Sequence, residues 1–266
     1  MARQDEIIEL VKRVRPYSVN HLYRYRHVAS RELPLIFEGR HVHFADPTTF
    51  NDPFECRPYL IPPSSLEAEL YLRDLARTRY PLNDKKAIKK IARNRKRKLL
   101  DHDFLEKVYE NYIKLVGVYC LSEKEDDILM WSHYSDKHRG VCIEFDSSKK
   151  DTLFWEGTKV VYQEDYPKVK ILHLGNPQYL RNSLLTKSNH WEYEQERRIL
   201  RFEREGGPGN YKFPAELLTG VILGASIQQP DREKIINWII SYPKRINVYQ
   251  AKISRTKYKL DIEQIE

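Results

Sequence analysis

Six short apolar runs after residue 115 constrain the fold of the chain more than any other feature. Each has the length of a β-strand and is rich in Val, Ile, Leu or aromatic residues. The runs are VGVYCLS (116–122), RGVCIEFD (139–146), TKVVYQ (158–163), RRILRF (197–202), GVILG (220–224) and NVYQAKIS (247–254). Since strands are also predicted at 21–28 and 41–46, the pattern indicates one large mixed or antiparallel sheet.

Helical segments separate these predicted strands. Short helices are predicted at 3–14, 30–38, 126–134, 176–189 and 229–241. Residues 64–114 have a helical pattern throughout, with a break near Pro81. We therefore predict a single α+β domain over residues 1–266, β-rich, with a helical insertion at 64–114.

Basic residues are in excess, and they concentrate in the predicted insertion. The 266 residues carry a formal net charge of +8, which favours a polyanionic partner, nucleic acid first. Nine of the fourteen residues from 85 to 98 are Lys or Arg, and none is acidic. The nucleic-acid-binding residues predicted on this helix are Lys85, Lys86, Lys89, Lys90, Arg93, Arg95, Lys96, Arg97 and Lys98.

Several common function classes leave no trace in the sequence. Neither G-x-G-x-x-G nor G-x-x-x-x-G-K-[ST] occurs, which weakens the case for a Rossmann or P-loop enzyme. Cys56, Cys120 and Cys142 form no C-x-x-C pair, so we predict reduced core thiols in a cytoplasmic protein. No stretch resembles a signal peptide or approaches the ~20 apolar residues of a membrane span, so no membrane partner is expected.

Two local clusters in the first half could bind a ligand. On an extended strand, Arg24 and Arg26 share one face, where planar guanidinium groups could bind phosphate. The alternative is an exposed basic strand face, with Tyr23 and Tyr25 on the other side. In FNDPFE (50–55), Asn51 and Asp52 could hold a turn through side chain to backbone bonds, with Phe50 and Phe54 anchoring it in the core. Asp52 or Glu55 could instead bind a metal or a ribose hydroxyl.

A third cluster, MWSHYSDKHRGVCIEFD (130–146), combines aromatic rings with a histidine. Trp131, His133 and Tyr134 lie on a short predicted helix or at its end. Aromatic rings in a cleft can stack on a base or on nicotinamide. His133 could act as an acid or base near neutral pH, but a histidine beside a tryptophan is more often simply packed.

The fourth cluster, WEYEQERRIL (191–200), places a glutamate at every second position. We predict an extended approach to the strand RRILRF, which puts Glu192, Glu194 and Glu196 on one face. Such carboxylates repel one another unless cations neutralise them. The candidate cations are Arg24, Arg26, Arg197 and Arg198. A solvated helix is the alternative, in which Glu192 and Glu196 are neighbours and Glu194 points away.

Together these clusters resemble a bacterial family, domain of unknown function 2971. Its members carry a Tyr-Lys/Arg-Tyr strand, F-N-D-P-F-[DE], M-W-x-x-Y with G-V-C-[IL]-x-[FY], and W-x-Y-E-x-E-x-R. Here these motifs are LYRYR, FNDPFE, MWSHYSDKHRGVCIEF and WEYEQERR, in the same order, from about residue 21 to 202. The basic segment 85–98 and the chain after about 225 lie outside the resemblance. The genomes in which the family occurs imply a role in conflict with phage or in toxicity.

The order of a basic residue, a tyrosine and a late glutamate is also similar to the triad of ADP-ribosyltransferase folds. That resemblance implies that Arg24 holds NAD, that Tyr134 stacks on nicotinamide, and that Glu196 is catalytic, with Glu194 as the second candidate. A developing positive charge on the ribose would be stabilised by a fixed carboxylate. Tyr25, Arg26, Asn51, Asp52, Trp131 and His133 complete the expected cofactor-binding set. The sequence departs from the triad in having Arg in place of the commoner His, and no clear Ser-Thr-Ser strand.

Three functions remain open from the sequence. The first is a NAD-dependent ADP-ribosyltransferase-like enzyme acting on nucleic acid or protein, for which no metal is predicted. The second is a nucleic-acid-binding or regulatory protein without enzymatic activity, in which the charged clusters form a buried salt-bridge network. The third is a metal-dependent nuclease with Asp52, Glu55, Glu194 and Glu196 as ligands of Mg²⁺.

Overall fold

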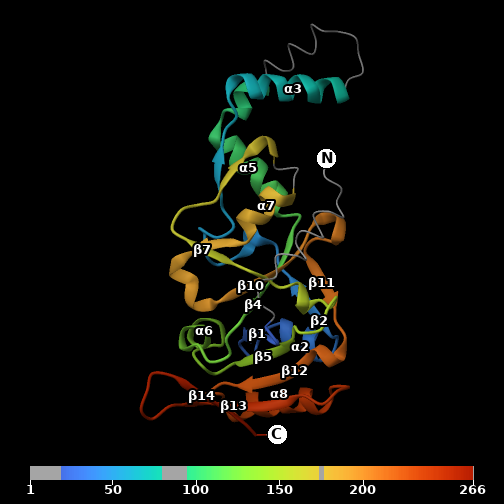
Figure 1. Cartoon of the computed structure of the whole chain (residues 1–266). Coiled ribbons are helices and arrows are strands. Elements are labelled where there is room, and N and C mark those ends of the chain that lie inside the picture. Colours follow the sequence, from blue (N-terminus) through green and yellow to red (C-terminus); the bar gives the residue numbers. More distant parts are fainter. Residues whose placement is uncertain (1–18, 80–94, 174–176, 266) are drawn as a thin grey trace. The chain divides into compact units, whose positions relative to one another are not determined.

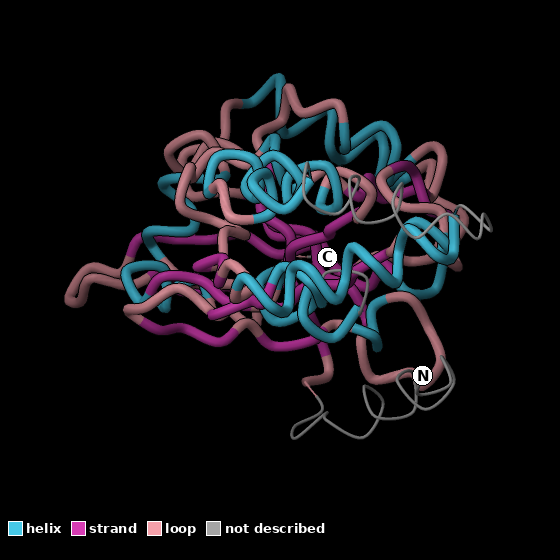
Figure 2. The backbone as a smooth tube through the Cα atoms, turned by 90° about the horizontal axis from the view of Figure 1, so that it is seen from above, coloured by secondary structure: helices cyan, strands magenta, loops and turns pink. Residues whose placement is uncertain are grey.

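The computed structural model describes residues 19–79, 95–173 and 177–265 (Figure 1). Helices and strands both contribute substantially to this part of the chain, which confirms the predicted α+β class (Figure 2). The predicted helix at 3–14 lies outside the described residues, as do Lys85, Lys86, Lys89, Lys90 and Arg93.

The chain divides into two compact units. The first comprises Met1–Ala45, Gly117–Tyr162 and Asn189–Glu266, and the second comprises Asp46–Val116 and Gln163–Ser188. The predicted insertion, 64–114, falls inside the second unit, which also draws on the segment between Gln163 and Ser188. Each unit has its own buried residues and is described separately below.

An eight-stranded mixed sheet forms the frame of the first unit. Its spatial order is β14-β13-β12-β5-β1-β4-β10-β6, so the first strand of the chain is central and the second and third strands of this sheet flank it. The strands are β1 (His21–Arg26), β4 (Gly117–Ser122), β5 (Val141–Asp146), β6 (Thr158–Lys159), β10 (Glu196–Arg201), β12 (Leu218–Leu223), β13 (Asn247–Ile253) and β14 (Leu260–Gln264). A separate antiparallel pair joins β2 (His41–Phe44) to β11 (Gly209–Lys212).

Short helices complete the first unit. The α-helices are α2 (Glu32–Phe37), α6 (Ile128–Tyr134) and α8 (Gln229–Ile240). The 3₁₀-helices are η2 (Phe154–Glu156), η4 (Asn189–Glu194), η5 (Glu203–Glu205) and η6 (Ala215–Leu217). The predicted strand at 158–163 is divided at Val160, where β6 ends before β7 (Val161–Gln163) begins.

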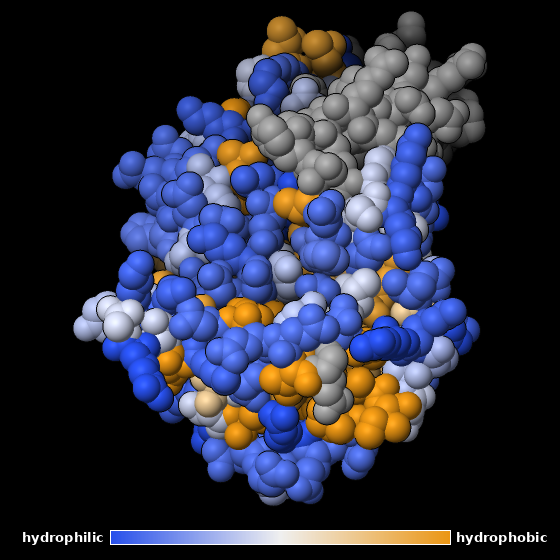
Figure 3. All heavy atoms as spheres, turned by 60° about the horizontal axis from the view of Figure 1, so that its bottom comes forward, coloured by the Kyte–Doolittle hydropathy of each residue, from blue (hydrophilic) through white to orange (hydrophobic). Residues whose placement is uncertain are grey.

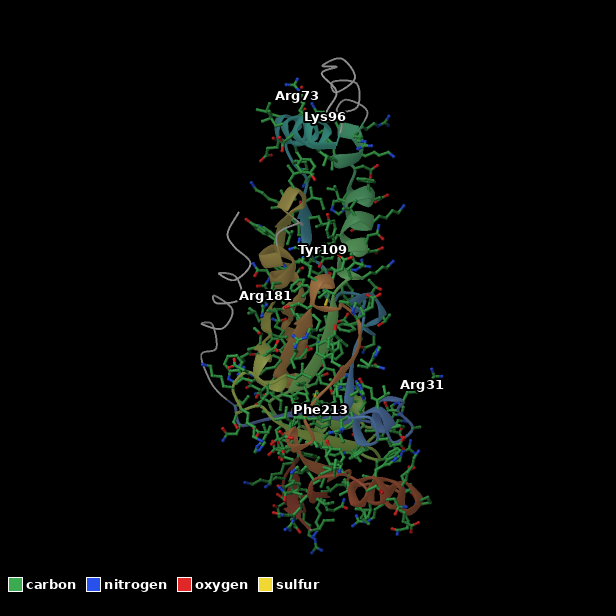
Figure 4. All side chains as sticks on the ribbon, turned by 90° about the vertical axis from the view of Figure 1, so that its right-hand side faces the viewer. Arg31, Arg73, Lys96, Tyr109, Arg181 and Phe213 are labelled. Carbon is green, nitrogen blue, oxygen red and sulfur yellow. The ribbon has the colours of Figure 1, made fainter. Side chains whose placement is uncertain are left out.

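The two faces of the sheet bury different sets of side chains. Successive strand residues point to opposite faces. Leu22 and Ile143 therefore pack in a large cluster with Phe213, which Figure 4 labels. Tyr23 and Cys142 point the other way and pack in a smaller cluster with Trp131 of α6. This second face carries the candidate site.

The second unit is built mainly from helices. They are α3 (Ser65–Arg79), α5 (His102–Ile113), α7 (Pro177–Leu184), η1 (Pro47–Thr49) and η3 (Ile171–His173). The strands β3 (Tyr59–Ile61) and β8 (Lys168–Lys170) pair in parallel, and β9 (Thr186–Ser188) follows α7. Tyr109 of α5, labelled in Figure 4, is buried, and its hydroxyl lies 2.7 Å from both the carbonyl oxygen of Cys56 and the hydroxyl of Ser183.

The three cysteines are not joined by disulfide bonds. Cys56 and Cys142 are buried and Cys120 is partly buried. Burial raises the pKa of the Cys142 thiol well above its ordinary value. Cys142 is therefore an unreactive core residue at neutral pH.

The surface of the described residues has two features that bear on partners. No helix in the described ranges is both long and apolar enough to cross a membrane. Exposed apolar side chains include Ile240 on α8 and Ile253 on β13, and Figure 3 shows apolar side chains gathered on one face of the molecule.

Candidate active site

A row of directly paired residues crosses five neighbouring strands of the large sheet (Figure 1). The strands are β12, β5, β1, β4 and β10, in that order. Gly220 pairs with Glu144, Glu144 with Tyr23, Tyr23 with Ser122, and Ser122 with Glu196. Directly opposed residues place their side chains on the same face. The pairing therefore brings two carboxylates, a phenol and a hydroxyl from distant parts of the sequence onto one face.

The sheet splits beside this row. β1 pairs with β5 at six consecutive positions, but with β4 only at Tyr23 and Ser122. Beyond that point, the Arg24 side chain reaches β4 and donates to the carbonyl of Cys120 at 2.5 Å. A hydrogen bond from the Arg24 side chain thus takes the place of backbone hydrogen bonds between β1 and β4 next to the candidate site.

Glu196 is the first residue of β10, and its carboxylate is held by an arginine of the same strand. Arg198 donates from Nε to Oε1 at 2.7 Å and from Nη2 to Oε2 at 2.9 Å. Both side chains are buried, and Arg198 is wholly inaccessible to solvent. The bidentate geometry fixes the carboxylate in position, because both of its oxygens are engaged by one planar group. The sequence prediction that a cation such as Arg198 neutralises this cluster is confirmed.

Glu194 is also buried, and it is held from two sides. The hydroxyl of Tyr134, on α6, donates to its Oε1 at 2.6 Å. The hydroxyl of Ser122 donates to its backbone carbonyl at 2.7 Å. The Glu194 carboxylate therefore links α6 to the start of β10.

The segment before β10 is not the extended approach that we predicted. Residues Asn189–Glu194 form the 3₁₀-helix η4, in which Glu192 is exposed while Glu194 is buried. Gln195 then takes a left-handed conformation, with φ 42°. This single residue turns the chain from helix to strand, and it separates the two buried carboxylates. The alternation of the three glutamates misled the prediction because a 3₁₀-turn, unlike a strand, does not repeat every second residue.

Arg24 and Arg26 do not point to the face of Glu196, contrary to our expectation. Both form ion pairs with Glu32 of α2, and the Arg24 guanidinium lies 4.7 Å from the ring centre of Tyr119. Burial alone would lower the pKa of Arg24, but the charge of Glu32 and more weakly that of Glu196 raise it above its usual value. The two arginines thus stabilise the packing of α2 against the opposite face.

Two other residues that we expected to bind a ligand, Trp131 and Tyr25, are instead part of the hydrophobic core. Trp131 is fully buried, and its Nε1 donates to the carbonyl of Glu125 at 2.8 Å. Tyr25 is buried edge-on against Trp131, with ring centres 5.3 Å apart, and donates to the carbonyl of Lys124 at 2.7 Å. Their rings have no open face on which a ligand could stack.

A series of partly exposed rings lies beside Glu194 instead. The ring of His133 is 6.3 Å from that of Tyr134 and 6.3 Å from that of Tyr193, and Tyr193 is 5.9 Å from Trp191. Tyr134 and His133 come from the end of α6, and Tyr193 and Trp191 come from η4. The two motifs on which we predicted the site are therefore brought together by these four rings.

A second polar group lies further along the same row, and the sequence did not point to it. Glu144 accepts from Thr219 Oγ1 at 2.8 Å and from the hydroxyl of Tyr23 at 3.5 Å, and His21 Nε2 lies 4.0 Å from its Oε1. Burial, followed by the nearby charges of Asp126 and Glu144, raises the pKa of Glu125. The one pattern that could have indicated this group is the alternation of His21 and Tyr23 on the first strand, which places both side chains on the same face.

The remaining predicted residues belong to the second unit. Asp52 Oδ1 accepts from the backbone N–H of Phe54 at 2.9 Å, which confirms the predicted turn. Phe54 is 66% exposed, so the prediction that it anchors this turn in the core is wrong. Glu55 forms a buried ion pair with Lys187 at 3.5 Å. Asn51 is exposed, and no contact among the described residues links it to a ligand site.

The basic segment is described only from Arg95 onward. Residues 95–99 are helical, and Lys96 Nζ lies 3.6 Å from Glu69 of α3 (Figure 4). Lys98 lies 5.9 Å from the ring centre of Phe104. The predicted binding of nucleic acid by this segment stays a prediction.

Within the described ranges, no group of three or more His, Cys, Asp or Glu side chains is arranged to hold a metal ion. Of the four carboxylates named for the nuclease hypothesis, Glu55 pairs with Lys187 and Glu196 with Arg198.

Residues 130–199 match a family model described as "Protein of unknown function (DUF2971)". The matched segment begins within α6 and ends within β10, and it contains Tyr134, Glu194, Glu196 and Arg198. It supports the resemblance to this family that the motifs indicated. No curated protein and no solved structure gives a significant match to the chain.

Proposed function

We propose that the protein is an ADP-ribosyltransferase-like enzyme that uses NAD as its substrate. The observation that carries the proposal is the Glu196 carboxylate, buried at the first residue of β10 and held by both donors of Arg198. It shares one face of the sheet with Ser122 and Tyr23 and lies two residues from the Glu194–Tyr134 pair. A preorganised carboxylate of this kind suits a reaction in which positive charge develops.

In the proposed reaction, the bond between ribose C1′ and the nicotinamide nitrogen breaks, and nicotinamide leaves with the bonding electron pair. The sugar passes through an oxocarbenium-like state, whose positive charge the Glu196 carboxylate stabilises. A nucleophile on the acceptor then bonds to C1′ and loses its proton to solvent. Water as the acceptor would give ADP-ribose and nicotinamide.

The pairing with Arg198 is compatible with this role. A carboxylate offers about four acceptor positions on its two oxygens, and Arg198 occupies one on each oxygen. The ion pair therefore holds both carboxylate oxygens in one fixed orientation. Because both side chains are buried, little reorganisation is needed when the sugar becomes charged.

Tyr134 is proposed to provide the ring that packs on nicotinamide. Its hydroxyl is fixed by Glu194 at 2.6 Å, so the orientation of its ring is set before any ligand binds. Tyr134 is partly exposed, whereas Trp131 one turn earlier is wholly buried. Stacking on nicotinamide is thus assigned to Tyr134 rather than to Trp131.

The proposed binding of NAD is tested by scanning calorimetry, which measures the melting temperature of three proteins with and without NAD or ADP-ribose. These are the wild type, Glu196→Gln and Glu192→Gln. Glu192 is the matched control because it lies on η4 and is exposed. We expect NAD to raise the melting temperature of the wild type and of Glu192→Gln by mass action. Absence of any NAD or ADP-ribose binding by the folded wild type would contradict the proposal.

A second candidate function is a nucleic-acid-binding protein without turnover. The observation in its favour is that the charged groups near the site pair internally, Glu196 with Arg198 and Glu123 with Arg197. Buried ion pairs of this kind can have a purely structural role, in which they define the fold. Tight binding of an oligonucleotide, together with no binding of NAD, would favour this candidate.

A further inference from the structure

We infer that the outer rings of the site bind bases of a single-stranded polynucleotide, which makes such a strand the acceptor substrate. The rings concerned are those of His133, Tyr193 and Trp191. This inference rests on the proposed function for its chemistry, but the binding surface itself can be tested without NAD.

The rings form a continuous series that begins with Tyr134, whose hydroxyl contacts the Glu194 carboxylate. Tyr134 contacts Glu194, His133 lies next to Tyr134, Tyr193 next to His133, and Trp191 next to Tyr193. Neighbouring ring centres are 5.9 to 6.3 Å apart. The proposed function assigns only the first ring of this series, Tyr134, to nicotinamide. The remaining rings therefore suit further planar groups.

These rings are held in place by the fold. Tyr134 and Tyr193 pack against the buried cluster that contains Trp131 and Tyr23. Trp191 and Tyr193 belong to the same 3₁₀-helix, and each is only partly exposed. Rings that are ordered in advance lose little side-chain entropy when a ligand stacks on them.

Net charge and base stacking favour a single-stranded polynucleotide over a duplex. The chain has a net charge of +8, which attracts a phosphate backbone at long range. Aromatic platforms bind bases of any sequence, because every base has a π-face. Bases in a duplex are already stacked and paired, so they reach such rings only after costly unstacking.

Transfer to such a strand needs no further reagent. C1′ of the ribose would bond to a nucleophilic nitrogen of the bound base, nicotinamide would leave with the bonding pair, and the proton of that nitrogen would pass to solvent. Tyr134, at one end of the ring series, contacts Glu194, which is two residues from Glu196 in the chain.

The test is fluorescence anisotropy of a labelled 12-mer with no NAD present. The probes are single-stranded DNA, single-stranded RNA of the same sequence, and the corresponding duplex DNA. The proteins are the wild type, Tyr193→Phe, Tyr193→Leu, Trp191→Leu and the control Tyr258→Leu. Tyr258 belongs to the same unit and is fully exposed. Thermal melting of each variant establishes that it is folded.

We expect the wild type to bind single strands more tightly than the duplex. Tyr193→Leu and Trp191→Leu should each weaken single-strand binding roughly 5- to 100-fold, the effect of losing one base-stacking ring. Tyr193→Phe, which keeps the ring, and Tyr258→Leu should bind as the wild type does. The DNA and RNA arms show which polynucleotide is preferred.

Unchanged affinity in folded Tyr193→Leu and Trp191→Leu would overturn the inference, as would preferential binding of the duplex. If single strands bind through these rings but NAD is not cleaved, the proposed function fails while the binding surface stands. If NAD is cleaved but no single strand binds, the inference fails while the proposed function stands.

Discussion

At the scale of single residues, the site depends on one unusual backbone conformation. Gln195 lies between the two buried carboxylates and has φ 42°. The left-handed region costs an L-residue roughly 1–2 kcal/mol and is often found where function requires a strained geometry. Here it allows Glu194 to end a helix and Glu196 to begin a strand within three residues.

This conformation gives a stability prediction. Gln195→Val should be about 1–2 kcal/mol less stable to unfolding than Gln195→Gly, because glycine accepts positive φ and a β-branched residue does not. The measurement is denaturant unfolding of the two variants and the wild type. Equal stability of the two variants would mean that the left-handed turn is not retained in solution.

At the scale of elements, the segment between β4 and α6 carries a half-buried carboxylate that makes stability depend on pH. Burial and the charges of Asp126 and Glu144 raise the pKa of Glu125, although His21 opposes the shift. With a raised pKa, the folded state keeps its proton when the unfolded state has already lost it. Stability therefore falls as pH rises from the ordinary value of 4.5 through the folded pKa.

Glu125→Gln removes this dependence. We expect the variant to be more stable than the wild type at pH 7, with the difference shrinking as the pH falls toward 4. Unfolding at a series of pH values measures it, and Glu192→Gln, at an exposed position, is the control. A difference that grows as the pH falls would show that the sign of the shift is wrong.

Elements differ in how well the sequence predicts them. The strands β5, β10 and β12 were predicted because buried strands are continuous runs of Val, Ile and Leu. The edge strand β14 was missed because LDIEQ has too few apolar residues to stand out. The η4 helix was misread as extended because its glutamates alternate by chance. Glu194, Glu196 and Tyr134 were identified from motifs, whereas their contacts needed the pairing of distant strands.

The face to which a residue points could not be predicted from its motif alone. Arg24 and Tyr23 are neighbours, yet one packs toward α2 and the other lies in the row with Glu196. Which of them meets the carboxylate is decided by the register of β1 against β4 and β5. That register is set by tertiary packing, which a single sequence does not display.

At the scale of the whole molecule, the positive charge should make polynucleotide binding depend on salt. Arg95 and Arg97 are exposed on the described part of the basic segment. Changing both to Gln should lower the slope of log affinity against log salt by about 1.4, since each phosphate contact on a single strand contributes roughly 0.7. Titrations between low and moderate salt measure the slope.

A matched pair of changes controls for charge. Lys257→Gln with Lys252→Gln removes the same net charge from the hairpin of β13 and β14, and both residues are exposed. We expect the slope of this variant to equal that of the wild type. If the two double variants have equal slopes, the basic segment contributes only to the overall charge and makes no phosphate contact.

The central claim, that Glu196 stabilises a charged sugar, is tested most directly by release of nicotinamide from NAD. Wild type, Glu196→Gln, Glu196→Asp and Glu192→Gln are compared, each after melting has shown that it is folded. We expect release by the wild type and by Glu192→Gln, and a loss of at least about a hundredfold in both Glu196 variants. Release that continues undiminished in folded Glu196→Gln, or no release by the wild type with any acceptor strand present, would contradict it.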